Sequence, residues 1–284
     1  MKVVSFSVPK TSREAFRIQA DKLPYFYDKL HEHPEIQITL ILKGEGTLIA
    51  GDYVGRFKSN EIYILGNHQP HVFRNDEHYY EKKTNGVHSI SLYFDKTYLG
   101  ENFWNLIEMK PALQFIEKTK KGFKVKGKTK VLLESLIQTI PSQKNMNRII
   151  SFLEMMNILC TSKELESLGV AAQHETYNPT ESKRMNELLH FTFTESNRKI
   201  YIREAASIAN LSTEAFCRYF KLRTRKTYTR FLNEVRISNA CRLLQTKEAS
   251  VQQVCFDVGF NNLSHFNRIF KKILGQTPRS YMKL

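Results

Sequence analysis

The chain has 284 residues, 41% of them hydrophobic, and carries 43 Lys and Arg against 28 Asp and Glu, a net charge of +15. This length and apolar content allow substantial cores and predict two domains. The N-terminus lacks the apolar stretch of a secretory signal, and no apolar run approaches the ~20 residues that span a bilayer. We therefore expect a cytoplasmic protein without a membrane partner.

Basic residues concentrate toward the C-terminus. Residues 183–284 hold 8 Lys and 11 Arg against 6 Glu and 1 Asp, which is +12 of the total +15. A strongly basic segment joined to a nearly neutral one predicts a polyanionic partner for the C-terminal part alone. Charge by itself would suit RNA, a ribosome or a membrane surface as well as duplex DNA.

The cysteines show no metal-binding or disulfide pattern. Cys160, Cys217, Cys241 and Cys255 form no CxxC pair and no Cys/His spacing typical of zinc ligands. Such usage fits a reducing cytosol. We expect no cofactor.

Residues 1–98 are predicted to form β-strands. Short runs rich in Ile, Leu, Val, Tyr and Phe are separated by turns that contain Gly, Asn or Asp. The runs are QITLILKG, GTLIAGDY, EIYILG, HVFRND and VHSISLYF. Many short strands at close spacing favour a barrel or a sandwich.

From about residue 103 the hydrophobic period becomes that of amphipathic helices. The run FWNLIEMKPALQFIEKTK and the segments 128–140 and 145–162 place apolar residues three and four apart. The broad apolar faces of the last two segments either cover the β-domain and each other or form a homodimer interface. Residues 171–182 include Asn178-Pro179 and are predicted to link to a new helical domain that begins near residue 183.

The pattern F-x-R-x-F-K occurs twice, at 216–221 and at 266–271. Each copy follows a short predicted helix, 202–209 in the first case and 251–258 in the second. A tight turn separates the two helices of each unit, and a side chain that favours helix N-caps follows it. The first turn is Asn210-Leu211 with Ser212 as the cap, and the second is Gly259-Phe260 with Asn261 or Asn262. This is the helix-turn-helix plan.

The two Phe residues of each copy are four apart and should be buried on one helix face, while Arg218 and Arg268 fall on another face. Between the units, Thr227 to Gln245 is predicted as one helix of about 28 Å. That length is near the ~34 Å between successive major-groove faces on one side of DNA. One helix could therefore hold two recognition helices on adjacent major-groove segments.

Residues 183–284 resemble the DNA-binding domain of the AraC/XylS family of transcription regulators. The likeness is strongest in VCFDVGFNNLSHFNRIFKKILGQTPRSYMKL. The residues that fit the family pattern are Gly259-Phe260, Phe266, Arg268, Phe270-Lys271-Lys272, Gly275, Thr277-Pro278 and Tyr281. The resemblance implies that the second helix of each unit reads bases in duplex DNA.

Carried over by position, the resemblance implies two sets of base-reading residues. The first reader would present Thr213, Glu214, Cys217 and Arg218, and the second would present Leu263, Ser264, His265, Asn267 and Arg268. Arg commonly reads guanine, and Glu can accept a hydrogen bond from cytosine. Phosphate contacts are expected from Lys221, Arg225, Lys226, Lys271 and Lys272.

Arg225 departs from the family, which usually has Gly after the first reader helix. If the position needs a positive φ, Arg there costs about 1 kcal/mol. Alternatively, the turn is built differently and Arg225 faces a phosphate. We favour the second interpretation.

The N-terminal half carries two motifs that resemble those of cupin barrels. His31-Glu32-His33-Pro34-Glu35, followed by a strand and Lys43-Gly44-Glu45-Gly46, resembles the first motif. Asn60-Glu61 through Pro70-His71 resembles the second, with Asn60 where Gly is usual. Enzymatic cupins bind a metal through these motifs, and the resemblance implies that the ligands here would be His31, His33, Glu35 or Gln37, and His71.

Regulators of the AraC/XylS family keep a similar pattern without metal and use the barrel as a ligand pocket. The resemblance therefore favours a metal-free effector site at His31, His33, Glu35 and His71. A metal site, and a barrel that only dimerises, remain alternatives.

The sequence thus predicts an α+β protein of two domains, a cupin-like β-barrel with a helical hairpin and an all-α double helix-turn-helix. The expected parts are a sensor barrel at 1–98, a helical linker and dimerisation region at 99–170, a linker at 171–182 and the DNA-binding domain at 183–284. We expect a non-enzymatic regulator that binds specific DNA sequences and responds to a small-molecule effector, by family analogy a sugar or related metabolite. A homodimer is expected, and RNA polymerase is a candidate partner. The rival hypotheses are a metal-dependent cupin enzyme with a DNA-binding tail and a non-specific nucleic-acid packaging protein.

Overall fold

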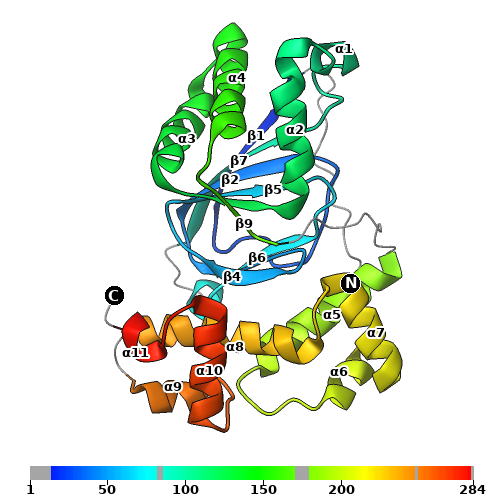
Figure 1. Cartoon of the computed structure of the whole chain (residues 1–284), viewed down its shortest axis with the longest axis vertical. Helices are drawn as coiled ribbons and strands as arrows, with labels where there is room; N and C mark the ends of the chain where they lie inside the picture. Colours follow the sequence, from blue (N-terminus) through cyan, green and yellow to red (C-terminus); the bar gives the residue numbers. More distant parts are fainter. Residues whose placement is uncertain (1–13, 82–85, 170–178, 247–248, 283–284) are drawn as a thin grey trace. The chain divides into compact units, whose positions relative to one another are not determined.

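The computed structural model describes residues 14–81, 86–169, 179–246 and 249–282. Within these ranges the chain forms two compact units, which are described separately. The N-terminal unit combines strands with helices, and the C-terminal unit is helical, which is the predicted α+β organisation (Figure 1). Most of the predicted linker 171–182 lies outside the described residues.

The strands of the N-terminal unit form two open sheets, of which the larger has the order β1-β7-β2-β5-β8-β9 and the smaller β4-β3-β6. The strands are β1 Arg17–Leu23, β2 Ile36–Lys43, β3 Gly46–Ala50, β4 Tyr53–Phe57, β5 Glu61–Leu65, β6 His71–Asn75, β7 Val87–Phe94, β8 Phe123–Val125 and β9 Leu165–Ser167. The five predicted runs are confirmed as strands. The sheets do not close into one continuous barrel, because β8 pairs with the edge of β5 that β2 leaves free.

Side chains along β2 alternate between two hydrophobic cores. Ile36, Ile38 and Leu40 belong to the core beneath the helices. Ile41 belongs to the core that also contains Leu48 of β3 in the smaller sheet. The strand is buried on both faces, and two of the side chains between the apolar ones, Gln37 and Thr39, are buried polar residues.

Helices cover the outer face of the larger sheet (Figure 1). They are α1 Glu101–Trp104, α2 Lys110–Lys118, α3 Gly127–Thr139 and α4 Asn145–Thr161, with short 3-10 turns at Glu77–Tyr80, Ile107–Met109, Thr119–Lys121 and Ile140–Ser142. Pro lies in the first turn of α2, where its missing N–H costs no hydrogen bond, so the first predicted helical run is divided there.

The predicted apolar faces of α3 and α4 are divided between the core and solvent. Leu133 and Phe152 are fully buried under the sheet-facing side of these helices. On their other sides lie four exposed apolar side chains, Val131, Leu132, Met146 and Ile150. The covering role is therefore confirmed, while a second apolar surface is left open to solvent.

The C-terminal unit consists of two helix-turn-helix units at opposite ends of α8 (Figure 1). Its helices are α5 Pro179–Glu195, α6 Ile202–Ile208, α7 Thr213–Thr224, α8 Tyr228–Thr246, α9 Val251–Asp257, α10 Leu263–Leu274 and α11 Pro278–Tyr281. The predicted helices α6, α8 and α9 are confirmed with small differences at their ends. No helix in the described ranges is both long and apolar enough to cross a membrane.

Each helix-turn-helix unit has a small core of its own. In the first, Phe216 and Phe220 are fully buried and pack edge-on against Tyr228 of α8, with ring centroids 5.3 Å apart in both pairs. In the second, Phe266 and Phe270 are fully buried in a cluster with residues of α8 and α9. The predicted Phe pairs are confirmed as core residues, which fixes the outward faces of α7 and α10.

Candidate nucleic-acid interface and cavity

The first helix-turn-helix presents the outer face of α7. Ser212 is its N-cap, as predicted, and the Ser212 hydroxyl accepts a hydrogen bond from the backbone N–H of Ala215 at 3.2 Å. Residues three and four apart lie on one side of a helix, and this side carries Glu214, Arg218 and Lys221, all exposed. Cys217 is also exposed, and Thr213 is half-buried.

Glu214 is placed to act as a hydrogen-bond acceptor. Hydrogen bonds from its own backbone amide and from the Ser212 side chain hold the pKa of Glu214 below its usual range. The side chain therefore remains a carboxylate at neutral pH, which is the form that can accept from the amino group of cytosine.

The second helix-turn-helix repeats this construction fifty residues later. Asn262 is the N-cap of α10, and its side-chain oxygen accepts from the backbone N–H of His265 at 2.8 Å. The exposed residues Ser264, Arg268 and Lys271 repeat the positions of Glu214, Arg218 and Lys221, and Lys272 is exposed beside them.

The remaining three predicted readers on α10 are half-buried. Leu263 packs against the core of the second unit, and the His265 ring lies edge-on to Phe260 with centroids 5.6 Å apart. Asn267 has the same intermediate exposure. These side chains therefore offer less accessible surface than Arg268.

Lys226 was predicted to contact a phosphate, and the structure contradicts this prediction. Its ammonium group is buried and lies 2.6 Å from Oε2 of Glu234, whose other oxygen accepts from Nε of Arg230 at 3.1 Å. A lysine held in a buried ion pair is not available to a phosphate. The burial of Lys226 was not predicted, because in the sequence it lies in a run of basic residues, which is typical of an exposed surface.

The turn after α7, at Arg225, differs from the predicted one. Its φ is +56°, in the left-handed region, and its backbone N–H donates to the oxygen of Lys221 at 2.8 Å. Gly275, fifty residues later, has φ +73° and donates to the oxygen of Lys271 at 2.9 Å. The two turns are therefore built alike, and the expectation of a different turn was wrong. The Arg225 side chain is exposed.

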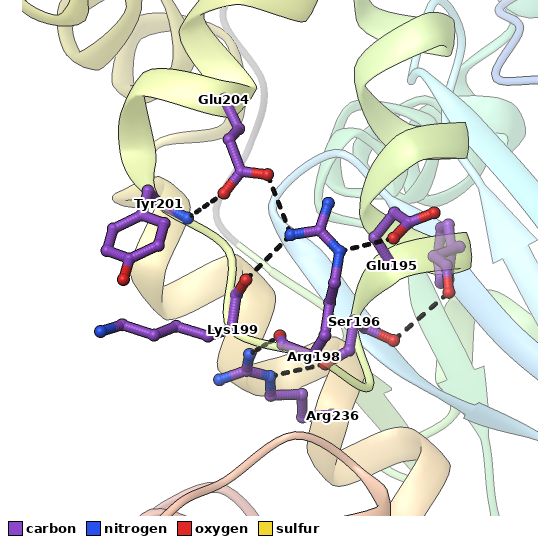
Figure 2. A network of polar contacts seen from close by, with 8 residues as sticks. Glu195, Ser196, Arg198, Lys199, Tyr201, Glu204 and Arg236 are labelled. Atoms are coloured by element: carbon purple, nitrogen blue, oxygen red, sulfur yellow. Dashed lines mark hydrogen bonds and ion pairs between the residues drawn. The ribbon is translucent and has the colours of Figure 1, made fainter.

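A polar network joins α5 and the loop after it to α6 and α8 (Figure 2). The guanidinium group of Arg198 contacts Glu195 at 2.6 Å and Glu204 at 2.9 Å, so it ties α5 to α6. Arg236 of α8 donates to the backbone oxygens of Ser196 and Arg198. Arg236 was not predicted, because nothing in the sequence distinguishes it from the other arginines of the basic domain.

The N-terminal unit contains a cavity of about 70 Å³. Its polar lining comes from the inward faces of β1, β2 and β7, namely Gln19, Asp21, Gln37, Thr39, Ser89 and Ser91. Aromatic rings complete it, those of Phe26, Tyr27, Phe73 and Tyr93. Most of these residues were not predicted, although polar residues at alternate positions of apolar strands were the available signal.

Two of the four predicted effector residues, His31 and His71, line this cavity. Their backbones form a β-bridge with hydrogen bonds of 3.1 and 2.8 Å, and their ring centroids are 4.3 Å apart. His33 lies beside them, with its ring centroid 5.1 Å from that of His71. Nitrogen atoms of the three rings lie within 4.8 Å of one another.

Burial keeps the three imidazoles neutral. Desolvation lowers the pKa of His31 to about 4, and it lowers the pKa values of His33 and His71 as well. For His71 the neighbouring His31 and His33 lower the pKa further. The cluster therefore offers lone pairs at neutral pH.

Glu35 does not line the cavity. Its carboxylate accepts from the Tyr98 hydroxyl at 3.2 Å and lies 3.6 Å from Nδ1 of His33. The backbone oxygen of Glu35 also accepts from His33 Nδ1, at 3.0 Å. Glu35 is thus placed beside the His33 ring and outside the cavity lining.

The sequence is similar to those of helix-turn-helix transcription regulators. A family model described as a helix-turn-helix domain matches residues 205–284. The chain is 27% identical over 281 residues to a protein described as the uncharacterised helix-turn-helix transcriptional regulator YdeC of Bacillus subtilis, covering 91% of this chain and 87% of that protein. It is 24% identical over 256 residues to the transcriptional activator RhaS of Escherichia coli, covering 88% and 85% of the two chains.

A solved structure of ToxT from Vibrio cholerae, bound to an unsaturated fatty acid, is 13% identical and covers 94% of each chain, with a TM-score of 0.38.

Proposed function

We propose that this chain, which belongs to the AraC/XylS family of helix-turn-helix transcription regulators, reads specific duplex DNA with α7 and α10. A small molecule bound in the N-terminal unit would control this DNA binding. The observation that carries the first part is the repetition of one construction. Both helices have a side-chain N-cap, two buried Phe residues and an exposed Arg at the same helical position.

The exposed residues divide into two roles by their chemistry. Arg218 and Arg268 each lie at the centre of an outward face, where a guanidinium can form two hydrogen bonds to guanine in the major groove. Lys221, Arg225, Lys271 and Lys272 lie toward the C-terminal ends of these helices, where they would contact phosphates and set the register.

The length of α8 determines the expected spacing of the two contacts. Its 19 residues span about 28 Å, and each helix-turn-helix packs against it. The two readers would then enter major-groove segments about one helical turn, or 10–10.5 base pairs, apart. Selection of binding sites from random duplexes tests this. Enrichment of two short elements at that spacing supports the proposal, and no enriched sequence would favour a non-specific packaging protein.

The cavity supports the effector part of the proposal. Polar side chains and aromatic rings both line it, and a volume of about 70 Å³ has room for a few water molecules. A small polar ligand, or the polar end of a larger one, fits this space. A thermal-shift screen with neutral monosaccharides is the first test. A sugar that stabilises the wild type but not a Thr39→Val variant supports the site, whereas stabilisation of both places the sugar elsewhere.

We also propose that the chain forms a homodimer through α3 and α4. These neighbouring helices expose Val131, Leu132, Met146 and Ile150, while their other faces are already packed under the sheet. Sedimentation of a Leu132→Glu, Ile150→Glu variant tests this interface. A wild-type dimer that becomes monomeric in the variant supports it, and an unchanged dimer contradicts it.

A further inference from the structure

A carboxylate lies in the lining of the N-terminal cavity. Asp21 of β1 contributes it, and among the described residues of the lining there is no Lys or Arg. Both oxygens of the Asp21 carboxylate accept from Nε2 of Gln19, each at 3.0 Å. This uncharged amide satisfies part of the hydrogen-bonding capacity of Asp21 but does not neutralise its charge. Because charges interact strongly where water is excluded, the cavity favours a positively charged ligand.

The uncharged polar groups of the lining are partly occupied by one another. Nε2 of Gln37 donates to the Thr39 hydroxyl at 2.6 Å, and the hydroxyls of Thr39 and Ser91 are 2.9 Å apart. Thr39 and Ser91 lie opposite each other on the paired strands β2 and β7, so this row of hydrogen bonds crosses the sheet. Donors of the lining are thus used within the protein, which leaves a ligand to supply N–H or O–H groups of its own.

His71 adds a buried acceptor to the same lining. Its Nδ1 lies 2.7 Å from the backbone oxygen of Gln69, and a carbonyl oxygen only accepts hydrogen bonds. The neutral ring therefore carries its proton on Nδ1 and its lone pair on Nε2. Nε2 is buried and has no hydrogen-bond partner in the part of the chain that the structure describes. A buried acceptor without a donor is costly, so a ligand N–H that reached this atom would be stabilised.

Aromatic rings complete the surroundings of a cation. The rings that line the cavity are those of Phe26, Tyr27, Phe73 and Tyr93. The face of an aromatic ring attracts a cation that lies within about 6 Å of its centroid. We propose that the cavity binds the cationic end of a small organic amine, an ammonium or guanidinium group, with the Asp21 carboxylate as its counter-charge.

This inference rests on the proposed effector function and names the class of effector. A volume of about 70 Å³ has room for a few water molecules, and hence for a head group of a few non-hydrogen atoms. An ammonium or guanidinium group is of that size and presents several N–H donors in addition to its charge. A neutral sugar would leave the charge of Asp21 uncompensated, and a carboxylate ligand would be repelled by it.

Calorimetric titration of the full-length protein with butylguanidinium chloride and with butylurea tests the proposal. The two probes have nearly the same shape, and only the first is charged. The wild type is expected to bind butylguanidinium about 10-fold or more tightly than butylurea. Asp21→Asn should remove this preference by weakening butylguanidinium binding about 10-fold or more, with little effect on butylurea. Glu108→Gln, which removes an exposed carboxylate outside the cavity lining, is the matched control and should bind as the wild type does.

Circular dichroism shows whether each variant is folded, and the comparison of the two probes on the wild type needs no variant. The proposal is overturned if the wild type binds butylurea as tightly as butylguanidinium, if it binds neither, or if folded Asp21→Asn binds butylguanidinium as tightly as the wild type. Titration with glucose separates this result from the effector function. Saturable binding of glucose without binding of butylguanidinium would retain the effector site and overturn the cationic ligand class.

Discussion

Nε of Arg236, in the middle of α8, donates to the backbone oxygen of Ser196 at 2.8 Å. The same guanidinium donates from Nη2 to the oxygen of Arg198 at 2.7 Å and lies over the Phe260 ring at 5.5 Å. One buried side chain thus contacts the loop before α6 and the turn before α10. It couples the two helix-turn-helix units, whose relative orientation determines whether both readers fit one DNA site.

Replacing Arg236 should loosen this coupling. Arg236→Met leaves two carbonyls without a charged donor, and we expect it to lower the free energy of unfolding by about 1–3 kcal/mol. Affinity for a DNA site with both elements should fall, while affinity for a single element should change little. Arg236→Lys keeps the charge but not the planar pair of donors, so an intermediate loss is expected. Thermal unfolding and fluorescence anisotropy measure both quantities, and equal losses on full and half sites would refute the coupling.

Arg225→Gly should stabilise the protein. Arg225 has a φ of +56°, and a glycine there avoids the left-handed strain, which is worth up to about 1 kcal/mol. If the exposed Arg225 side chain contacts a phosphate, the salt dependence of DNA binding should also weaken by about one unit of slope. Denaturant unfolding and binding at several salt concentrations test the two effects. An unchanged slope with unchanged affinity would remove Arg225 from the phosphate contacts.

Substitution by Met should lower the stability of the protein at Lys226 and weaken the salt dependence of DNA binding at Lys221. Lys226→Met leaves Glu234 buried with only Arg230 as a cationic partner, so we expect stability to fall by about 2–3 kcal/mol with no change in the salt slope. Lys221→Met removes an exposed charge on α7, so stability should hold while the slope decreases by about one. A reduced slope for Lys226→Met would show that this lysine reaches DNA.

The sequence predicted the parts of the fold that local patterns determine. Phe216 and Phe220, four residues apart, specify a helix with one buried face, and their recurrence as Phe266 and Phe270 revealed the duplicated unit. The polar residues that follow each turn include the observed caps, Ser212 and Asn262. Such features depend on neighbours along the chain, which a single sequence displays directly.

The features that escaped prediction depend on contacts between distant segments. Strand β8, Phe123–Val125, has only three residues and lies in a lysine-rich segment, so only its pairing with β5 identifies it. Gly259 has a φ of +88°, and a Cβ there would lie 2.4 Å from the oxygen of Ser196, sixty-three residues earlier. Nothing in the local sequence shows that this loop approaches the turn.

The clustered histidines were partly predictable. The spacing of His31 and His33 and the later His71 were visible in the sequence, and the structure brings the three rings together. The role of Glu35 was not visible, because its side chain contacts Tyr98 from a segment sixty-three residues away. The position of the Glu35 carboxylate, just before β2, depends on that tertiary contact.

The central claim is that the exposed arginines of α7 and α10 read bases, and the binding of Arg268→Ala to selected and random duplexes tests it most directly. We predict a loss of about 1–3 kcal/mol in binding free energy on the selected site, with relaxed preference at one base pair and a much smaller loss on random DNA. Equal losses on both duplexes, with the selected sequence preference unchanged, would contradict it.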